Sequence, residues 1–204
     1  MTISGFIQAG GKSRRMGRNK ALLRLGSRTL IEHMISILSP LVSQIGIITN
    51  DPDFYEHLGV ECYADRWSGL GPLAGIGAAL SHARDDYSLI LACDMPFVRR
   101  PLLDLLVEQG QGYQVCVPQS ADRQLEPLCA LYHRSCLEAI ERLIAEGRYS
   151  PRDLFSEVKT RIISFESFAD LEGAAHFFDN LNTPDDFASA ELIFNHEEHE
   201  EHEG

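Results

Sequence analysis

The chain opens with an apolar run, Ile3 to Ile7, that stops shortly before the glycine pair Gly10-Gly11. On a chain whose formal net charge is -12, five cations then follow closely: Lys12, Arg14, Arg15, Arg18 and Lys20. Glycine lets the backbone come close to a ligand, and the bare N–H groups of such a loop can surround an anion. Lysine and arginine add charge that hydrogen-bonds phosphate. The segment therefore predicts a first strand that delivers a polyphosphate-binding loop.

Two common phosphate-binding patterns do not explain this loop. A P-loop ending at Gly11-Lys12-Ser13 would need its first glycine where Phe6 stands, inside the predicted strand. A Gly-x-Gly-x-x-Ala string begins at Gly69, but no strand runs directly into it. The strand-turn-helix context of a dinucleotide-binding fold is therefore missing.

Short β-rich runs alternate with helical patterns along the chain. This alternation predicts a three-layer α/β/α, Rossmann-like fold with a mostly parallel central sheet. Strands are expected at 4–8, 45–49, 60–64, 88–93, 114–118, 128–133 and 162–165. Helices are expected from the capping box Thr29–Glu32 to Leu38, after a glycine-rich connection at 68–77, and at 102–109, 136–146 and 184–194.

The length of 204 residues predicts one domain, which we place at 1–195. Residues 196–204 are rich in His and Glu and are expected to form a disordered, acidic tail. The start of the chain lacks a signal-peptide pattern, and no apolar run is long enough to span a bilayer, so we expect a cytoplasmic protein. Five scattered cysteines indicate reduced thiols, and the acidic balance argues against nucleic-acid binding.

Polar residues follow four of the predicted strands. The glycine loop follows the first, and Asn50, Asp65 and Asp94 follow the next three. Because the carboxyl ends of parallel strands meet at one edge of a sheet, these groups are expected to line one cleft. Asp94 could hold Mg²⁺ together with substrate phosphates, or it could cap the following turn. Asn50 and Asp65 could bind a ligand or simply end their strands through turn chemistry.

Several motifs occur together in the order typical of one enzyme family. They are Ala9-Gly10-Gly11, Gly71-Pro72-Leu73-Ala74-Gly75, Cys93-Asp94-Met95-Pro96, Glu126-Pro127-Leu128 and Asn180-Leu181-Asn182-Thr183-Pro184. On these motifs the chain resembles the molybdenum cofactor guanylyltransferases over about residues 3 to 190. The resemblance implies a nucleotidyltransferase version of the predicted fold. Gln8 departs from the apolar residue more usual at its position, which puts a role of its side chain in doubt.

The resemblance implies that GMP passes from GTP to the terminal phosphate of molybdenum-molybdopterin, with release of pyrophosphate. It implies nucleotide contacts at Gln8, Ala9, Gly10, Gly11, Lys20, Asn50, Asp65 and Asp94. Asp94 would also hold Mg²⁺ as the cofactor, Lys20 and Arg15 would neutralise developing charge, and Asn180 and Asn182 would contact the pterin. It also allows transient contacts with proteins that deliver molybdopterin or mature molybdoenzymes, and it suggests no membrane partner.

Other functions stay open at this stage. A cytidylyltransferase making the cytosine form of the same cofactor would use CTP, although its loop usually reads Ala-Ala-Gly where this chain has Ala9-Gly10-Gly11. A sugar-phosphate nucleotidyltransferase is a weaker alternative. A non-catalytic nucleotide- or cofactor-binding protein would keep the glycine loop but could dispense with Asp94. The His-rich tail could also bind metal, although such tracts are only compositional signals.

Overall fold

A seven-stranded sheet forms the centre of the molecule. The computed structural model describes residues 2–10 and 19–201, with side chains described up to residue 194. β8 runs antiparallel to both of its neighbours, whereas the other described pairs of the sheet are parallel. Across the sheet the strands are β5 (Glu61–Tyr63), β4 (Gln44–Ile48), β1 (Ile3–Gln8), β6 (Tyr87–Ala92), β8 (Cys129–His133), β7 (Val115–Pro118) and β9 (Thr160–Ile163). The predicted mostly parallel sheet is confirmed.

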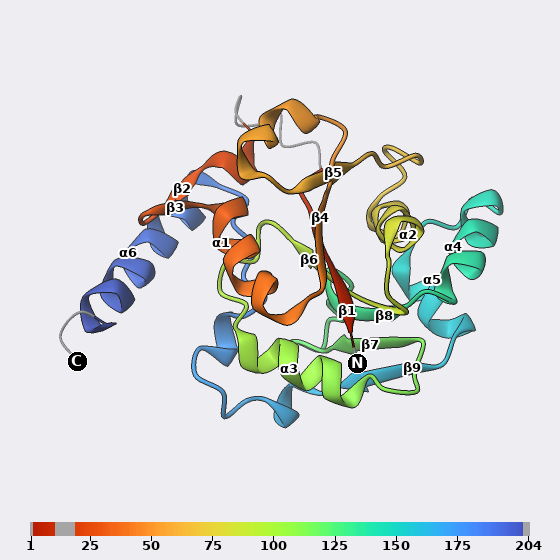
Figure 1. Ribbon diagram of the computed structural model, residues 1–204. Coiled ribbons are helices and arrows are strands. Elements are labelled where there is room, and N and C mark those ends of the chain that lie inside the picture. Colours follow the sequence, from red (N-terminus) through yellow and green to blue (C-terminus); the bar gives the residue numbers. More distant parts are fainter. Residues whose placement is uncertain (1, 11–18, 202–204) are drawn as a thin grey trace.

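Helices cover both faces of this sheet, which gives the three predicted layers (Figure 1). One face carries α1 (Leu30–Leu38) and α3 (Arg100–Gln109), and the other carries α2 (Pro72–His82), α4 (Cys136–Ala145) and α5 (Pro151–Glu157). Each face has its own apolar core. Ile7 packs on the α1 side and Phe6 on the α2 side, because successive residues of a strand point to opposite faces.

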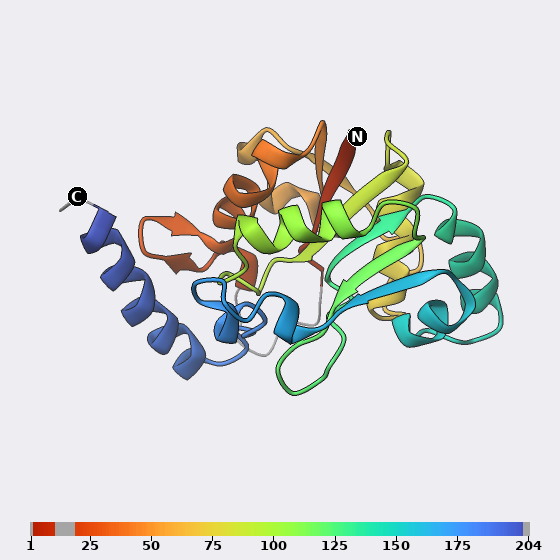
Figure 2. The same cartoon turned by 90° about the horizontal axis from the view of Figure 1, so that it is seen from below.

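The remaining elements are short, apart from the last helix. They are η2 (Lys20–Leu22), β2 (Arg24–Leu25), β3 (Arg28–Thr29), η3 (Ser39–Leu41), η4 (Pro52–Phe54), η5 (Glu56–Leu58), η6 (Phe165–Ser167), η7 (Ala174–His176) and α6 (Pro184–Glu201). Figure 2 shows α6 beside the β2–β3 hairpin at one edge of the molecule, and Leu25, Leu30, Leu181 and Ala190 form a small core there.

The helix α6 is longer than expected. It was predicted to end at residue 194, but its backbone continues to Glu201 and so includes residues 196–201 of the predicted tail. Residues 202–204 lie outside the described residues. The division into a domain at 1–195 and a tail at 196–204 stays a prediction.

The helix α1 begins where its sequence signal predicts. The Thr29 side chain accepts a hydrogen bond from the Glu32 N–H at 3.4 Å, and Glu32 Oε2 accepts from the Thr29 N–H at 2.7 Å. Thr29→Ala should lower the free energy of unfolding by about 1 kcal/mol, because the Glu32 N–H loses the Thr29 hydroxyl that caps it. For a domain of this size we expect a fall in Tm of about 2–4 °C by calorimetry.

The control for this variant is Ser36→Ala on the same helix. The Ser36 hydroxyl donates to the His33 carbonyl, which lies within the helix and does not depend on that bond. We expect a change within about 0.5 kcal/mol at this position. Equal shifts in the two variants would show that the capping box contributes nothing of its own.

The start of α2 corrects one expectation. The glycine-rich connection was predicted to last to Gly77, but the helix begins at Pro72 and includes both Gly75 and Gly77. Proline suits a first helical turn because its φ is already helical. A Cβ at Gly75 would lie 2.6 Å from the side-chain amide of Gln8, and one at Gly77 would lie 2.8 Å from the ring of Trp67. These glycines therefore allow close packing rather than ending the helix.

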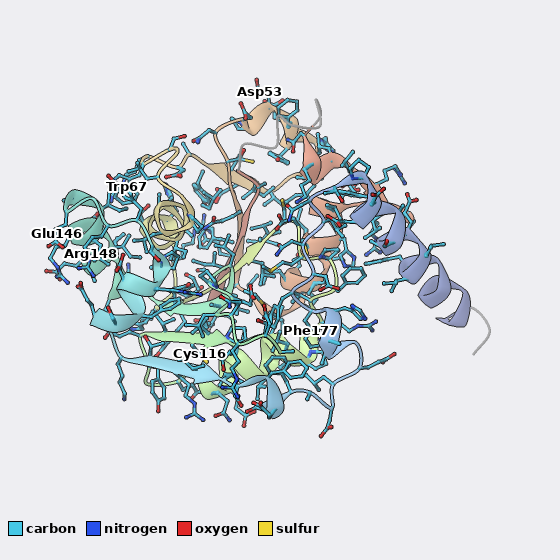
Figure 3. The ribbon with its side chains drawn as sticks, turned by 180° about the vertical axis from the view of Figure 1, so that it is seen from behind. Asp53, Trp67, Cys116, Glu146, Arg148 and Phe177 are labelled. Atoms are coloured by element: carbon cyan, nitrogen blue, oxygen red, sulfur yellow. The ribbon has the colours of Figure 1, made fainter. Side chains whose placement is uncertain are left out.

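The helix α5 was not predicted at all. Ser150 caps its first turn, and Arg148, just before it, pairs with Asp153 inside it at 3.2 Å. Figure 3 shows Arg148 and Glu146 at the outer edge of the molecule, while Cys116 and Phe177 lie in the interior. Because the Arg148 and Asp153 side chains are partly open to solvent, their pair contributes little to stability.

Two chain-wide expectations concern thiols and membranes. All five cysteines are free thiols, as predicted. Within the described part of the chain, no helix combines the length and the apolar character needed to cross a bilayer.

Candidate active site

The site is built at the carboxyl ends of β1 and β6, which are neighbouring parallel strands. Their register pairs Gln8 with Ala92. Backbone pairing continues past this point, since the Cys93 N–H donates to the Gln8 carbonyl and the Ala9 N–H donates to the Ile48 carbonyl, each at 3.1 Å. This pairing fixes Ala9 and Gly10 beside Asp94.

A small cavity of about 110 Å³ opens at this edge of the sheet. Its lining combines the end of β1, the start of η2 and the end of β6, and so includes two of the four strand ends that were expected to line one cleft. It is lined by Gln8, Ala9, Gly10, Asn19, Lys20, Ala21, Ala92, Cys93, Asp94 and Leu128. A larger cavity of about 430 Å³ lies between α1 and the start of α3 and carries none of the predicted site residues.

Lys20 is the central charge of this site. Its Nζ lies 2.9 Å from Asp94 Oδ2 and 2.9 Å from Asn182 Oδ1. Lys20 is only 7% exposed, and a buried ammonium is tolerated only where such partners compensate its desolvation. The contact joins three segments that are far apart in the sequence: the residues after the glycine loop, the end of β6 and the loop before α6.

The backbone on both sides of the glycine loop is held by Tyr55, which is fully buried. Its hydroxyl accepts from Asn19 Nδ2 at 2.9 Å and donates to the Ala9 carbonyl at 3.4 Å. Burial raises the pKa of Tyr55 to about 12, so the phenol stays protonated and can donate. Asn19 also caps η2, and thereby places Lys20. Sequence reasoning assigned no role to either residue, although Asn19 stands directly before Lys20 in the basic segment after the glycine loop.

The segment before α6 brings only one of its two predicted asparagines to Lys20. Asn182 contacts Lys20, whereas Asn180 is exposed and donates to the Phe178 carbonyl. The Leu181 N–H donates to the Asp94 carbonyl at 3.0 Å and so ties this segment to the end of β6.

Asp186 organises the same segment and was also missed. Its carboxylate accepts from the N–H groups of Asn182 and Thr183, each at 2.7 Å. These hydrogen bonds lower its pKa. The Asp186 N–H donates back to Thr183 Oγ1, as in a capping box. The spacing of Thr183 and Asp186 before a helix was the sequence signal that could have identified it.

Asn50 and Asp65 form a separate cluster at the ends of β4 and β5. Asn50 Oδ1 accepts from the Asp65 N–H at 3.1 Å, and Asp65 Oδ1 accepts from the Trp67 N–H at 2.9 Å. Burial raises the pKa of Asp65, and the hydrogen bond from Trp67 opposes that shift. Such contacts are the ones expected if Asn50 and Asp65 simply end their strands through turn chemistry. Neither residue lines the small cavity, so their role in nucleotide binding stays a prediction.

Part of the predicted loop lies outside the described residues. This applies to Gly11 and Arg15, and to the neighbouring cations Lys12, Arg14 and Arg18.

The chemistry available in the cavity is electrostatic. Asp94 is the one carboxylate among its described lining residues, and no three metal-ligating side chains cluster anywhere in the described structure. A single carboxylate fits a hard cation such as Mg²⁺ when substrate phosphates supply further ligands. Burial raises the pKa of Cys93 to about 12, so its thiol is not a poised nucleophile. The site can bind and neutralise phosphates without covalent catalysis.

Comparison with known proteins agrees with this geometry. Residues 5–161 match the MobA-like NTP transferase domain. A protein of Carboxydothermus hydrogenoformans named probable molybdenum cofactor guanylyltransferase is 37% identical over 188 residues, covering 92% of this chain and 94% of its own. A protein of Desulfosudis oleivorans named molybdenum cofactor guanylyltransferase is 32% identical over 191 residues, covering 93% and 94%.

Solved structures share the fold. Molybdopterin-guanine dinucleotide biosynthesis protein A from Archaeoglobus fulgidus superposes with a TM-score of 0.80 at 30% identity, covering 95% of this chain and 99% of its own. A 2-C-methyl-D-erythritol 4-phosphate cytidylyltransferase from Thermus thermophilus has a TM-score of 0.72 at 19% identity, covering 95% and 98%.

Proposed function

We propose, since this chain belongs to the MobA-like NTP transferase family, that it transfers GMP from GTP to the terminal phosphate of molybdenum-molybdopterin. The protein is a nucleotidyltransferase, and relatives that cover nearly its whole length are named molybdenum cofactor guanylyltransferases. The products are the molybdopterin guanine dinucleotide cofactor and pyrophosphate.

One contact supports this proposal more than any other. Lys20 Nζ lies 2.9 Å from Asp94 Oδ2 and from Asn182 Oδ1. It thus joins the nucleotide side of the site, at the glycine loop and Asp94, to the segment expected to meet the pterin. Two phosphorylated substrates that must react with each other would meet at this lysine.

In the proposed reaction an oxygen of the molybdopterin phosphate attacks the α-phosphorus of GTP. The bond from that phosphorus to the oxygen bridging the β-phosphate breaks, and the electron pair leaves with pyrophosphate. The attacking oxygen is already anionic, so no general base is needed. Catalysis then rests on positioning and charge neutralisation. Lys20, with Arg15 from the loop, would neutralise charge on the departing pyrophosphate.

Enzymes of this family generally use a divalent metal ion. For this chain we propose Mg²⁺, held by Asp94 together with phosphate oxygens of the nucleotide. Bound there, the ion would neutralise phosphate charge and align the α-phosphorus with the attacking oxygen. The Gly10 backbone would lie against the phosphates, since a Cβ there would meet nothing closer than 3.8 Å and the residue is exposed.

The choice of GTP over CTP is tested by binding. With Mg²⁺ present, GTP should bind the purified protein at least about tenfold more tightly than CTP, a difference of about 1.4 kcal/mol. Isothermal titration calorimetry measures both constants, and ATP serves as the purine control. Tighter binding of CTP would reassign the protein to the cytidylyltransferases of the same cofactor.

The proposed activity also leads to expectations about the location and the partners of the protein. As part of this proposal, the proposed substrates GTP and molybdenum-molybdopterin support a cytoplasmic location. Transient contacts with molybdopterin-delivering and molybdoenzyme-maturing proteins are expected. The net charge of -12 does not favour nucleic acid as a partner.

A further inference from the structure

Two buried side-chain polar atoms in the described structure have no hydrogen-bond partner. They are Gln8 Nε2 and Ser88 Oγ. Buried polar groups in folded proteins are nearly always paired, and an unpaired one costs stability. Ser88 lies near the amino end of β6, far along the strand from the candidate site, whereas Gln8 lines the cavity. The unpaired amide of Gln8 therefore needs a functional explanation.

The position of this amide is specified by its surroundings. Gln8 ends β1, and the alternation of that strand sends its side chain to the same face as Phe6, which packs in the core under α2. The amide lies against Gly75 of α2, where a Cβ would be 2.6 Å from its Cδ, Nε2 and Oε1 atoms. Only glycine at 75 leaves room for Gln8 as it stands. The helix and the strand end together hold the amide in place.

Gln8 lines the same cavity as Lys20 and Asp94, but its side chain lies on the α2 side. Asn19 and Lys20 are fixed from the α1 side, where Tyr55 and Ala21 belong to the core. On the α2 side, the two buried residues that precede Gly75 in the helix, Leu73 and Ala74, are apolar. A neutral donor on the apolar α2 side of the cavity suits a neutral, flat ligand group better than a phosphate, whose burial on that side would leave charge uncompensated.

We propose that the Gln8 side chain is a specificity-determining contact for the nucleobase, with Nε2 donating to the O6 carbonyl of guanine. The inference rests on the proposed function and adds a role for the side chain, beyond any contact made by its backbone. Guanine presents the acceptor O6 where adenine presents a donor amino group. An unpaired buried donor gains a hydrogen bond from the first base and none from the second. Binding of GTP would thereby offset the free-energy cost of leaving this donor unpaired in the free protein.

The test compares GTP with 2-aminopurine riboside triphosphate, which lacks O6 and, with it, the hydrogen on N1; only the part of the preference that Gln8→Met removes is assigned to O6. Binding of each to the full chain with Mg²⁺ is measured by calorimetry for the wild type and for Gln8→Met, which keeps the unbranched length but has no donor. The wild type should prefer GTP by about tenfold, the value of one buried hydrogen bond. In Gln8→Met this preference should fall to within about twofold.

A second readout is the stability of the free protein. Gln8→Met removes a buried donor that has no partner, so its Tm without nucleotide should rise by about 2–4 °C. The matched control is Ser88→Ala, which removes the other unpaired polar atom. Its Tm should also rise, while its preference for GTP stays at the wild-type value. Gln8→Leu provides a second apolar variant with the same expectations if Gln8→Met does not fold.

The outcomes separate this inference from the function on which it rests. If Gln8→Met or Gln8→Leu binds GTP and keeps the tenfold preference, the inference is overturned while the guanylyltransferase proposal stands. If the wild-type protein itself fails to bind GTP, the proposed function fails. An equal loss of preference in Ser88→Ala would also overturn the inference, because the effect would then not belong to the site.

Discussion

Asp94→Ala should reduce the release of pyrophosphate from GTP and molybdopterin by at least about 10²–10³-fold with the fold intact, since preorganised charge of this kind contributes on that scale. Asp94 is the one carboxylate among the described lining residues of the cavity, and its side chain is 26% exposed there. Removing it deprives Mg²⁺ of its proposed protein ligand and Lys20 of its ionic partner. The rate should also lose most of its dependence on Mg²⁺ concentration.

A coupled pyrophosphate assay measures this loss over a range of Mg²⁺ concentrations, and circular dichroism checks the fold. The control is Asp104→Ala, because Asp104 lies exposed on α3 and pairs along the helix with Arg100 at 3.4 Å. Its rate should equal that of the wild type. Full turnover by Asp94→Ala would refute the metal assignment, and an equal loss in Asp104→Ala would show that the assay reports general damage.

Lys20→Met should lower kcat/KM for GTP by about 10²–10³-fold, since a buried ammonium that neutralises phosphate charge acts mainly in the transition state. The side chain of Lys20 is 9% exposed and that of Asp94 is 26% exposed, so the variant also leaves Asp94 partly buried without its cation. The loss should therefore appear in kcat as well as in KM. Lys20→Arg should not restore the rate, because a planar guanidinium cannot reproduce a point charge between two oxygens.

Steady-state kinetics with varied GTP separate kcat from KM. Lys159→Met is the matched control, since Lys159 is exposed and bonds to the Gly112 carbonyl far from the site in the fold. A double-mutant cycle with Asn182→Ala then measures whether Lys20 and Asn182 act together. Unchanged kcat in Lys20→Met would remove Lys20 from the catalytic role, and strictly additive effects would separate it from Asn182.

Local sequence signals were enough to predict much of the fold. The capping box at Thr29 and Glu32 starts α1 as predicted, because its partners are three residues apart and need no tertiary context. The apolar run at 88–93 corresponds to β6, which runs from Tyr87 to Ala92 and is buried between two helical layers. In contrast, Gly75 and Gly77 suggested a loop but lie in α2, because their sequence neighbours say nothing about Gln8 and Trp67 packing against them.

The sequence likewise predicted some features of the candidate site and not others. Strand-end position was enough to bring Ala9, Gly10 and Asp94 to one edge of the sheet, since parallel neighbours share that edge. It was not enough for Asn50 and Asp65, which bond to each other at the next strand ends. Tyr55 and Asp186 act through hydrogen bonds to backbone groups of the site. No residue pattern around Tyr55 reveals this role, whereas Asp186 could have been found by its capping-box spacing.

The sequence by itself determined the three-layer fold and the family, and it predicted a phosphate-binding role for the first loop, because these depend on periodicity, composition and contiguous motifs. Only the tertiary structure decided that Lys20 pairs with Asp94 and Asn182, which are 74 and 162 positions away along the chain. Only the tertiary structure likewise shows that Gln8 Nε2 is buried without a hydrogen-bond partner. Such contacts depend on how separate segments pack against one another, and the hydrogen-bonding state of a side chain is fixed only when that packing is complete.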